Sequence, residues 1–176
     1  MKNNTDNSVF MEKYILEAFC KMGKYSEAQD RMKSQYDAMI NNVGYSSTLW
    51  EYWDYRDGSK NHAWAGGPLV IMSKYFAGIM PYKPGYEEIL IKPEFGKLKS
   101  IKANVSTIKG NVEVVLNKKD THISYEINVP EKTIIYVDKM EEDTVSIDGV
   151  EVESKNYEGD KVVLTLDKGK YNIISK

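Results

Sequence analysis

The chain has 176 residues, of which 41% are hydrophobic, and it carries a formal net charge of −2 at pH 7. This length is enough for one ordinary domain, or for a helical segment followed by a small β domain, and the apolar fraction excludes global disorder. Because no excess of positive charge is available to neutralise phosphates, the composition argues against nucleic acid as the main partner.

Cys20 is the single cysteine, so neither an internal disulfide nor a cysteine-based zinc site can be built from this chain. Its apolar neighbours favour a small buried hydrophobe over a reactive thiol. No apolar run is long enough to span a bilayer, and residues 1–5 lack the apolar stretch of a secretory signal. We therefore expect no membrane contact, while the compartment stays open because a larger parent protein could carry a signal upstream.

The first part of the chain follows a helical period. Apolar residues recur three or four positions apart after Ser8, which predicts a helix that ends at Gly23. Ser26 followed by Gln29 has the spacing of a capping box and predicts a second helix that stops before Gly44. The expected apolar faces are Met11, Ile15, Ala18, Phe19 and Met22 for the first helix, and Ala28, Met32, Tyr36 and Met39 for the second.

An aromatic segment follows these helices. All three tryptophans of the chain lie between Gly44 and Gly67. Tyrosines and hydrogen-bonding residues are mixed among them: Tyr45, Glu51, Tyr52, Asp54, Tyr55, Arg56, Asp57, Asn61 and His62. Carbohydrates require this mixture, because the C–H faces of a sugar ring pack on aromatic rings while its hydroxyls need polar partners. The alternative is that these aromatic side chains are simply part of a hydrophobic core.

A third helix is expected from Pro68, with the apolar face Leu69, Met72, Phe76 and Ile79, until Gly78 and Pro81 interrupt it. Three helices with apolar faces cannot close a core alone. They must pack on the rest of the chain, on a second copy, or on sequence that is missing here. Exposed apolar helix faces therefore favour a homo-oligomer.

From about Glu88 the period changes to two. Apolar and polar residues alternate over 101–105, 112–116, 123–129 and 162–166, which predicts half-buried strands. Asp148-Gly149 between two short apolar runs predicts a hairpin. Roughly eight strands at this spacing indicate an antiparallel two-sheet sandwich of the Greek-key or jelly-roll type. We expect an α+β chain with helices in residues 1–84 and a β-sandwich in residues 85–176.

Two motifs carry a resemblance to a known family. Ser47 to Trp53 read STLWEYW, and Gly58 to Trp64 read GSKNHAW. Together with the flanking segments 14–25, 76–79 and 85–93, they resemble the α-L-rhamnosidases of glycoside hydrolase family 78. The resemblance implies that the helices are the last ones of an (α/α)6 catalytic barrel and that the strands form the C-terminal β-sandwich. The chain would then be a multidomain fragment.

The resemblance also implies roles for individual residues. Members of the family invert the anomeric carbon with two carboxyl groups, one acting as general acid and the other as general base. Matched motif to motif, Glu51 takes the place of the general base and His62 that of a histidine that binds the sugar hydroxyls. Trp50 and Trp53 would form the walls of the pocket, and Asn61 would orient His62.

The general acid of the family comes from an earlier acidic motif, which nothing before Ser8 supplies. Asp54 and Asp57 lie on the same loop as Glu51 and are not expected to face it across a sugar. The resemblance thus implies a fragment of an enzyme that cleaves terminal α-L-rhamnosyl groups from glycans or glycosides, inactive alone and without a cofactor or metal. The alternatives are a non-catalytic carbohydrate-binding or accessory module, or a structural remnant.

Overall fold

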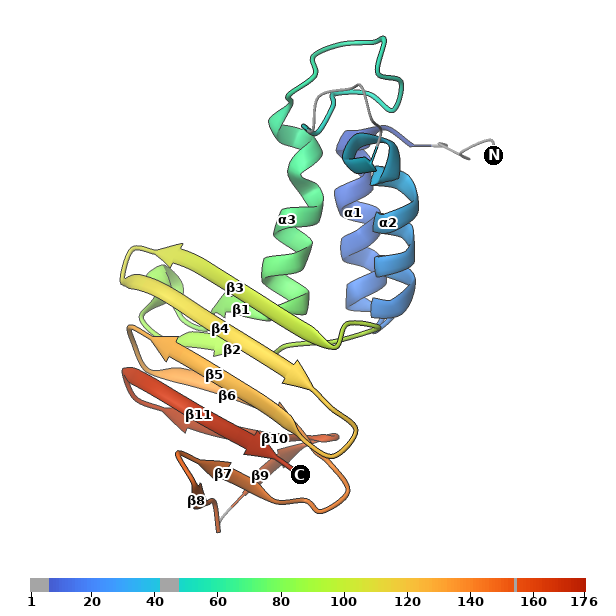
Figure 1. The fold of residues 1–176 in the computed structure, drawn as a ribbon. Helices are drawn as coiled ribbons and strands as arrows, with labels where there is room; N and C mark the ends of the chain where they lie inside the picture. Colours follow the sequence, from blue (N-terminus) through green and yellow to red (C-terminus); the bar gives the residue numbers. More distant parts are fainter. Residues whose placement is uncertain (1–6, 42–47, 154) are drawn as a thin grey trace. The chain divides into compact units, whose positions relative to one another are not determined.

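A computed structural model describes residues 7–41, 48–153 and 155–176. The chain divides into two compact units, Met1–Met72 and Ser73–Lys176. The first is helical and the second consists mainly of strands, as Figure 1 shows. The division falls before the expected boundary between residues 84 and 85, because Ile79–Pro81 form a strand of the second unit.

The first unit contains α1 (Val9–Lys21), α2 (Tyr25–Asn41), a 3-10 turn (Ala63–Gly66) and α3 (Gly67–Ile71). Ser8 caps α1, since its hydroxyl accepts a hydrogen bond from the Met11 N–H at 3.3 Å. Gly23, with φ of +73°, follows the last turn. Both ends of the first predicted helix are thus confirmed. The second helix begins at Tyr25, so the predicted capping role of Ser26 is wrong.

The buried face of α1 differs from the predicted one. The buried residues are Val9, Glu12, Leu16 and Cys20, whereas Met11 is 45% and Met22 60% exposed. The predicted face was chosen from apolar residues alone, whereas the buried face includes the charged residue Glu12. Its carboxylate is instead buried by pairing with Arg31 of α2, whose Nε donates to Glu12 Oε1 and whose second nitrogen donates to Oε2 at 2.8 Å. On α2, Ala28, Tyr36 and Met39 are buried as predicted.

The third helix is shorter than predicted. After α3 the backbone passes through a π turn, Met72–Phe76, and enters a strand at Ile79. The change of direction requires glycine at position 78. The φ of Gly78 is +71°, and an added Cβ would lie 2.1 Å from the carbonyl carbon of Lys92. The prediction that the third helix continues to Ile79 is therefore wrong, because Ile79 belongs to the strand β1 of the sandwich.

The second unit is a two-sheet sandwich (Figure 1). Among the described residues, one sheet has the order β1-β2-β6-β10-β9 and the other β3-β4-β5-β11-β7-β8. The strands are β1 (Ile79–Pro81), β2 (Ile89–Ile91), β3 (Ser100–Thr107), β4 (Gly110–Lys118), β5 (Ile123–Val129), β6 (Thr133–Asp138), β7 (Val145–Ile147), β8 (Val150–Glu151), β9 (Asn156–Glu158), β10 (Lys161–Leu166) and β11 (Gly169–Ser175).

The four alternating segments form β3, β4, β5 and β10, as predicted, and most of their apolar residues are buried; in β3 only Ile101 is fully buried. The predicted hairpin joins β7 and β8, where Ile147 pairs with Val150. Asp148 and Gly149 both have positive φ, the requirement of a type I′ turn. The sequence predicted two antiparallel sheets. One pair differs from this prediction, since β2 and β6 pair in parallel. This is possible because the chain between them is long enough for a crossover.

A buried ionic cluster lies within the sandwich. The Lys161 side chain is 7% exposed, and its Nζ donates to Asp138 Oδ1 at 2.6 Å and to the Pro93 carbonyl at 3.0 Å. Glu94 Oε1 lies 3.2 Å from the same nitrogen. The Tyr125 hydroxyl of the opposite sheet donates to Asp138 Oδ2 at 3.2 Å. Burial lowers the pKa of Lys161, but Asp138 and Glu94 outweigh it, so the pKa lies above the usual lysine value.

None of the helices in the described residues has the length and apolar character needed to cross a membrane.

Candidate active site

The aromatic loop is closed by two short segments that run side by side, residues 48–51 and 59–62. The Glu51 N–H donates to the Ser59 carbonyl at 3.0 Å, and the His62 N–H donates to the Leu49 carbonyl at 2.9 Å. The Thr48 hydroxyl donates to the carbonyl of Lys60. These bonds bring Glu51 and His62, which belong to different motifs, to the same end of the loop.

Gly58 allows the loop to close this tightly. Its φ is +57°, and an added Cβ would lie 2.7 Å from Glu51 Oε2 and 2.6 Å from the ring of Tyr52. A side chain at this position would therefore collide with the carboxylate as well as strain the backbone. The loop therefore requires glycine at the first position of the second motif, because the Glu51 carboxylate occupies the space of a side chain.

The carboxylate of Glu51 is held by a backbone donor. Its Oε2 accepts the Ser59 N–H at 2.9 Å, and the side chain remains 19% exposed. The Ser59 backbone N–H lowers the pKa of Glu51; burial opposes this, and the Ser59 side chain and His62 add to the lowering. Glu51 is consequently ionised at neutral pH, which is the state that a general base requires.

His62 lies beside this carboxylate. Its Nδ1 is 2.8 Å from the Ser59 hydroxyl oxygen and 3.6 Å from Glu51 Oε2. Nε2 lies on the opposite side of the ring from these contacts, and the side chain is 30% exposed. Ser59, which the sequence interpretation did not assign, thus holds both His62 and Glu51. Asn61 is exposed, and the hydrogen bond found here for the His62 ring involves Ser59.

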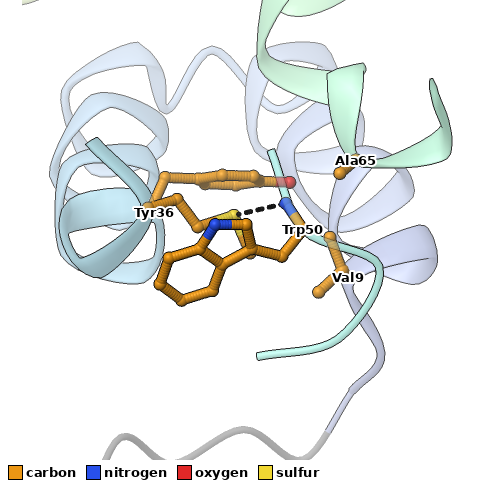
Figure 2. Packing of buried hydrophobic residues seen from close by; sticks show 5 residues of the cluster. Val9, Tyr36, Trp50 and Ala65 are labelled. Carbon is orange, nitrogen blue, oxygen red and sulfur yellow. Dashed lines mark hydrogen bonds between the residues drawn. The ribbon is translucent and has the colours of Figure 1, made fainter. Parts of the chain in front are cut away.

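Two of the three indoles are directed into the core, as Figure 2 shows for Trp50. Trp50 is 2% exposed and packs with Val9, Tyr36, Met39 and Ala65; its backbone N–H donates to the Met39 sulfur at 3.4 Å. The wall role expected of Trp50 does not fit this position, because its ring is covered. The Trp53 ring packs edge-on against Tyr36 at 5.3 Å and is partly buried.

The indole beside the carboxylate is that of Trp64. Its N–H donates to the Glu51 carbonyl at 3.2 Å, and its ring centroid is 4.0 Å from that of His62. The ring is 40% exposed. The sequence interpretation gave Trp64 no role, although its place two residues after His62 was a usable signal. Trp64, and not Trp50, offers an aromatic surface next to Glu51.

Asp54, a second carboxylate of this loop, is not suited to donate a proton. Asp54 is paired with Arg56, whose Nε lies 3.0 Å from Oδ1, and the hydrogen bonds from Arg56 hold the pKa of Asp54 well below its usual range. A general acid must carry a proton near neutral pH, which Asp54 does not. Glu12, on α1, is buried and paired with Arg31.

Comparison with known proteins shows what the chain is similar to. Residues 78–153 match the family described as bacterial alpha-L-rhamnosidase C-terminal domain. The solved α-L-rhamnosidase from Dictyoglumus thermophilum is 26% identical, with a TM-score of 0.81 over 94% of this chain and 20% of that chain.

Two further structures share the fold. The α-L-rhamnosidase of Streptomyces avermitilis, solved with L-rhamnose, is 18% identical with a TM-score of 0.68, over 94% of this chain and 17% of that one. The enzyme of Aspergillus terreus is 16% identical with a TM-score of 0.67, over 91% of this chain and 18% of that one. Among curated proteins, no match was found.

The chain is therefore related to glycoside hydrolases. More particularly, residues 78–153 match the C-terminal domain of bacterial α-L-rhamnosidases, and the fold of the chain is similar to part of the solved α-L-rhamnosidases, in agreement with the resemblance that the two motifs carry. It spans about a fifth of the length of the solved relatives that it matches, 20% of the first of them.

Proposed function

We propose that the chain carries the general-base half of an inverting α-L-rhamnosidase site, with Glu51 as the base and the helices of the first unit as the last ones of an (α/α)6 barrel. One observation carries the proposal. The Glu51 carboxylate, kept ionised by the Ser59 N–H at 2.9 Å, lies next to a histidine and an exposed indole. The carboxylate can serve as one of the two carboxyl groups that hydrolysis of a glycoside requires, and the imidazole and the aromatic face can bind the sugar.

The chemical step assigns Glu51 one proton. As the oxygen of a water molecule bonds to the anomeric carbon, Glu51 takes a proton from that water, and the bond from carbon to the leaving oxygen breaks. The leaving oxygen needs a proton from a second carboxyl group, which inverting enzymes place roughly 6.5–9.5 Å from the base. Asp54 and Glu12 are unsuited to this task because each is held by an arginine. The chain alone is therefore inactive.

Terminal α-L-rhamnosyl groups of glycans or glycosides are the proposed substrates. Rhamnose combines ring hydroxyls with an apolar methyl group on C5. His62 offers Nε2 to a hydroxyl, Asn61 adds an exposed amide beside it, and the exposed face of Trp64 suits the methyl group. The name of the Streptomyces relative, solved with L-rhamnose, is consistent with this sugar.

A second candidate function rests on a different surface. The outer face of the six-stranded sheet has a shallow hollow of about 430 Å³, lined by polar residues that include Glu113, Glu126, Asn128 and Asn172. Carboxylate and amide side chains of this kind can hold the hydroxyls of a neutral sugar. This hollow favours a non-catalytic carbohydrate-binding module in which the sandwich, and not the aromatic loop, binds the ligand.

Titration of the chain with L-rhamnose, followed by nuclear magnetic resonance, separates the two candidates. The half-site proposal predicts weak binding with shifts of the Ser59 amide and the Trp64 indole N–H. L-mannose, which has a hydroxymethyl group where rhamnose has the methyl group, should bind less well. Shifts confined to the side-chain amides of Asn128 and Asn172 would instead favour the module.

The chain should release no phenol from an aryl α-L-rhamnoside, and measurable turnover would contradict the half-site.

A further inference from the structure

The strand β3 leaves a long edge of the sandwich open. Among the described residues, β3 ends the six-stranded sheet and has β4 as its neighbour (Figure 1). It has eight residues, whereas β1, β8 and β9, which end the sheets elsewhere, have two or three. Its register with β4 runs from Ser100 to Thr107 without a break, so no bulge interrupts these residues. A further strand can therefore add along the whole length of β3.

The register also shows which backbone groups of β3 are open. The Lys118 N–H donates to the Lys99 carbonyl at 2.8 Å, so these two facing residues form a hydrogen-bonded pair. Because such pairs alternate along an antiparallel ladder, the odd-numbered residues of β3 bond to β4 and the even-numbered ones point their N–H and C=O groups away from it. The outward-pointing residues are Ser100, Lys102, Asn104 and Ser106. In the part of the chain that the structure describes, no hydrogen bond to these backbone groups is found.

The inner side of β3 is only partly covered. Val112, Val114 and Leu116 of the neighbouring β4 are fully buried. On β3, by contrast, Ala103 and Val105 remain half-buried, although they pair with residues of β4. An added strand with apolar residues at alternate positions would cover both side chains.

The charge along this edge is of one sign. Residues 95–112 contain four lysines and neither aspartate nor glutamate. The Lys102 side chain is exposed, and it lies on the outer side of the sheet because its neighbour Ile101 is buried on the inner side. Lysines on an edge strand oppose pairing with a like-charged edge, so a second copy of β3 is a poor occupant. The same lysines attract a strand that carries carboxylates.

We propose that β3 binds an extended acidic segment of a protein partner, which adds as a further strand to the six-stranded sheet. The segment places apolar side chains beside Ala103 and Val105 and carboxylates near Lys102. Backbone hydrogen bonds to the even-numbered residues supply affinity, and the lysines supply selectivity for acid. The inference does not depend on the proposed role of Glu51.

The test uses the full chain and two matched peptides, one of alternating valine and glutamate and the other of alternating valine and lysine. We expect the glutamate peptide to bind at least about tenfold more tightly at low salt, because opposite charges favour the complex. Nuclear magnetic resonance measures both the affinity and the exchange of individual amide hydrogens. The bound glutamate peptide should slow exchange at the even-numbered amides of β3, whereas the odd-numbered ones are already protected by β4.

The charge of Lys102 should control the preference between the peptides. Lys102→Glu should weaken binding of the glutamate peptide about fivefold and strengthen binding of the lysine peptide. Lys170→Glu, the same change at an exposed position on β11, should leave the preference in place.

The outward N–H of Asn104 should matter separately from its side chain. Asn104→Pro removes this donor without removing a bond to β4, which is the arrangement that edge strands tolerate. It should therefore weaken the glutamate peptide at least about tenfold, whereas Asn104→Ala, which keeps the N–H, should bind as the unchanged chain does. If Asn104→Pro does not fold, the Lys102→Glu comparison and the alternating amide exchange still decide the outcome.

Equal affinity for the two peptides, no measurable binding of the glutamate peptide, or full binding by a folded Asn104→Pro chain would overturn the proposal. Protection of the even-numbered amides that rises with the concentration of the chain alone would assign the edge to a second copy, and would also overturn it.

Discussion

Glu51→Gln in a catalytic domain completed by upstream sequence is expected to lower kcat for an aryl α-L-rhamnoside by about 10²–10⁴, the range of a lost general base. KM should change little, because glutamine keeps the shape of the side chain and can still accept the Ser59 N–H. Loss of kcat at constant substrate affinity identifies an interaction that matters only in the transition state. Steady-state kinetics measure both quantities.

The pH profile adds a second readout for Glu51. A base must be deprotonated, so activity falls when the pH drops through its pKa, and the Ser59 N–H places that pKa below the usual glutamate value. The fall in activity on the acidic side of the profile should therefore occur at a pH below the usual glutamate pKa. This fall should be absent from the residual activity of Glu51→Gln. Asp57→Asn, a change of an exposed carboxylate in the same loop, should keep both the rate and the limb. A Glu51→Gln enzyme within about threefold of normal turnover would refute the role.

Lys161→Ala should strongly destabilise the sandwich. It removes the ammonium that lies 2.6 Å from Asp138 and 3.2 Å from Glu94, whose side chains are 19% and 24% exposed. Breaking a buried ion pair on one side costs about 3–5 kcal/mol because the remaining charge stays buried without its partner. Urea unfolding followed by far-ultraviolet circular dichroism should show this loss. Lys170→Ala, on the exposed side of β11, should have almost none.

The pH dependence distinguishes this ion pair from mere packing. The folded-state pKa of Lys161 lies above its ordinary value, so its contribution to stability is complete below the usual lysine pKa and is lost as the pH rises through the folded value. The wild-type chain should therefore lose more stability on alkaline titration than Lys161→Ala does. Equal alkaline losses would mean that Lys161 acts through packing alone.

Features set by neighbouring residues could be predicted from the sequence. Ser8 and Gly23 bound α1 because a cap and a left-handed glycine act within one turn. Asp148-Gly149 specified a hairpin because both residues tolerate positive φ. The parallel pairing of β2 with β6 could not be predicted in this way, because it joins strands separated by a three-strand meander. The short β1 was missed since its pattern continues that of the preceding helix.

In the candidate site, too, local motifs could be recognised from the sequence, whereas tertiary contacts could not. Motif spacing brought Glu51 and His62 to attention, but it could not decide which indole faces the core. Trp50 is buried because Tyr36 and Met39 of α2 pack around it, a tertiary contact that no local pattern encodes. The buried carboxylate of Glu12 misled the assignment of α1 for the same reason, since its partner Arg31 lies on another helix.

Azide tests the role of Glu51 most directly. Azide is a nucleophile without a proton to lose, so it can attack the anomeric carbon when the base is absent. In a completed catalytic domain that carries Glu51→Ala, we expect azide to raise the rate of release of the aryl alcohol at least about tenfold, with β-L-rhamnosyl azide as the other product. The carbon–nitrogen bond forms as the bond to the leaving oxygen breaks. No rescue, or an azide product of α configuration, would contradict the assignment of Glu51 as the base of an inverting site.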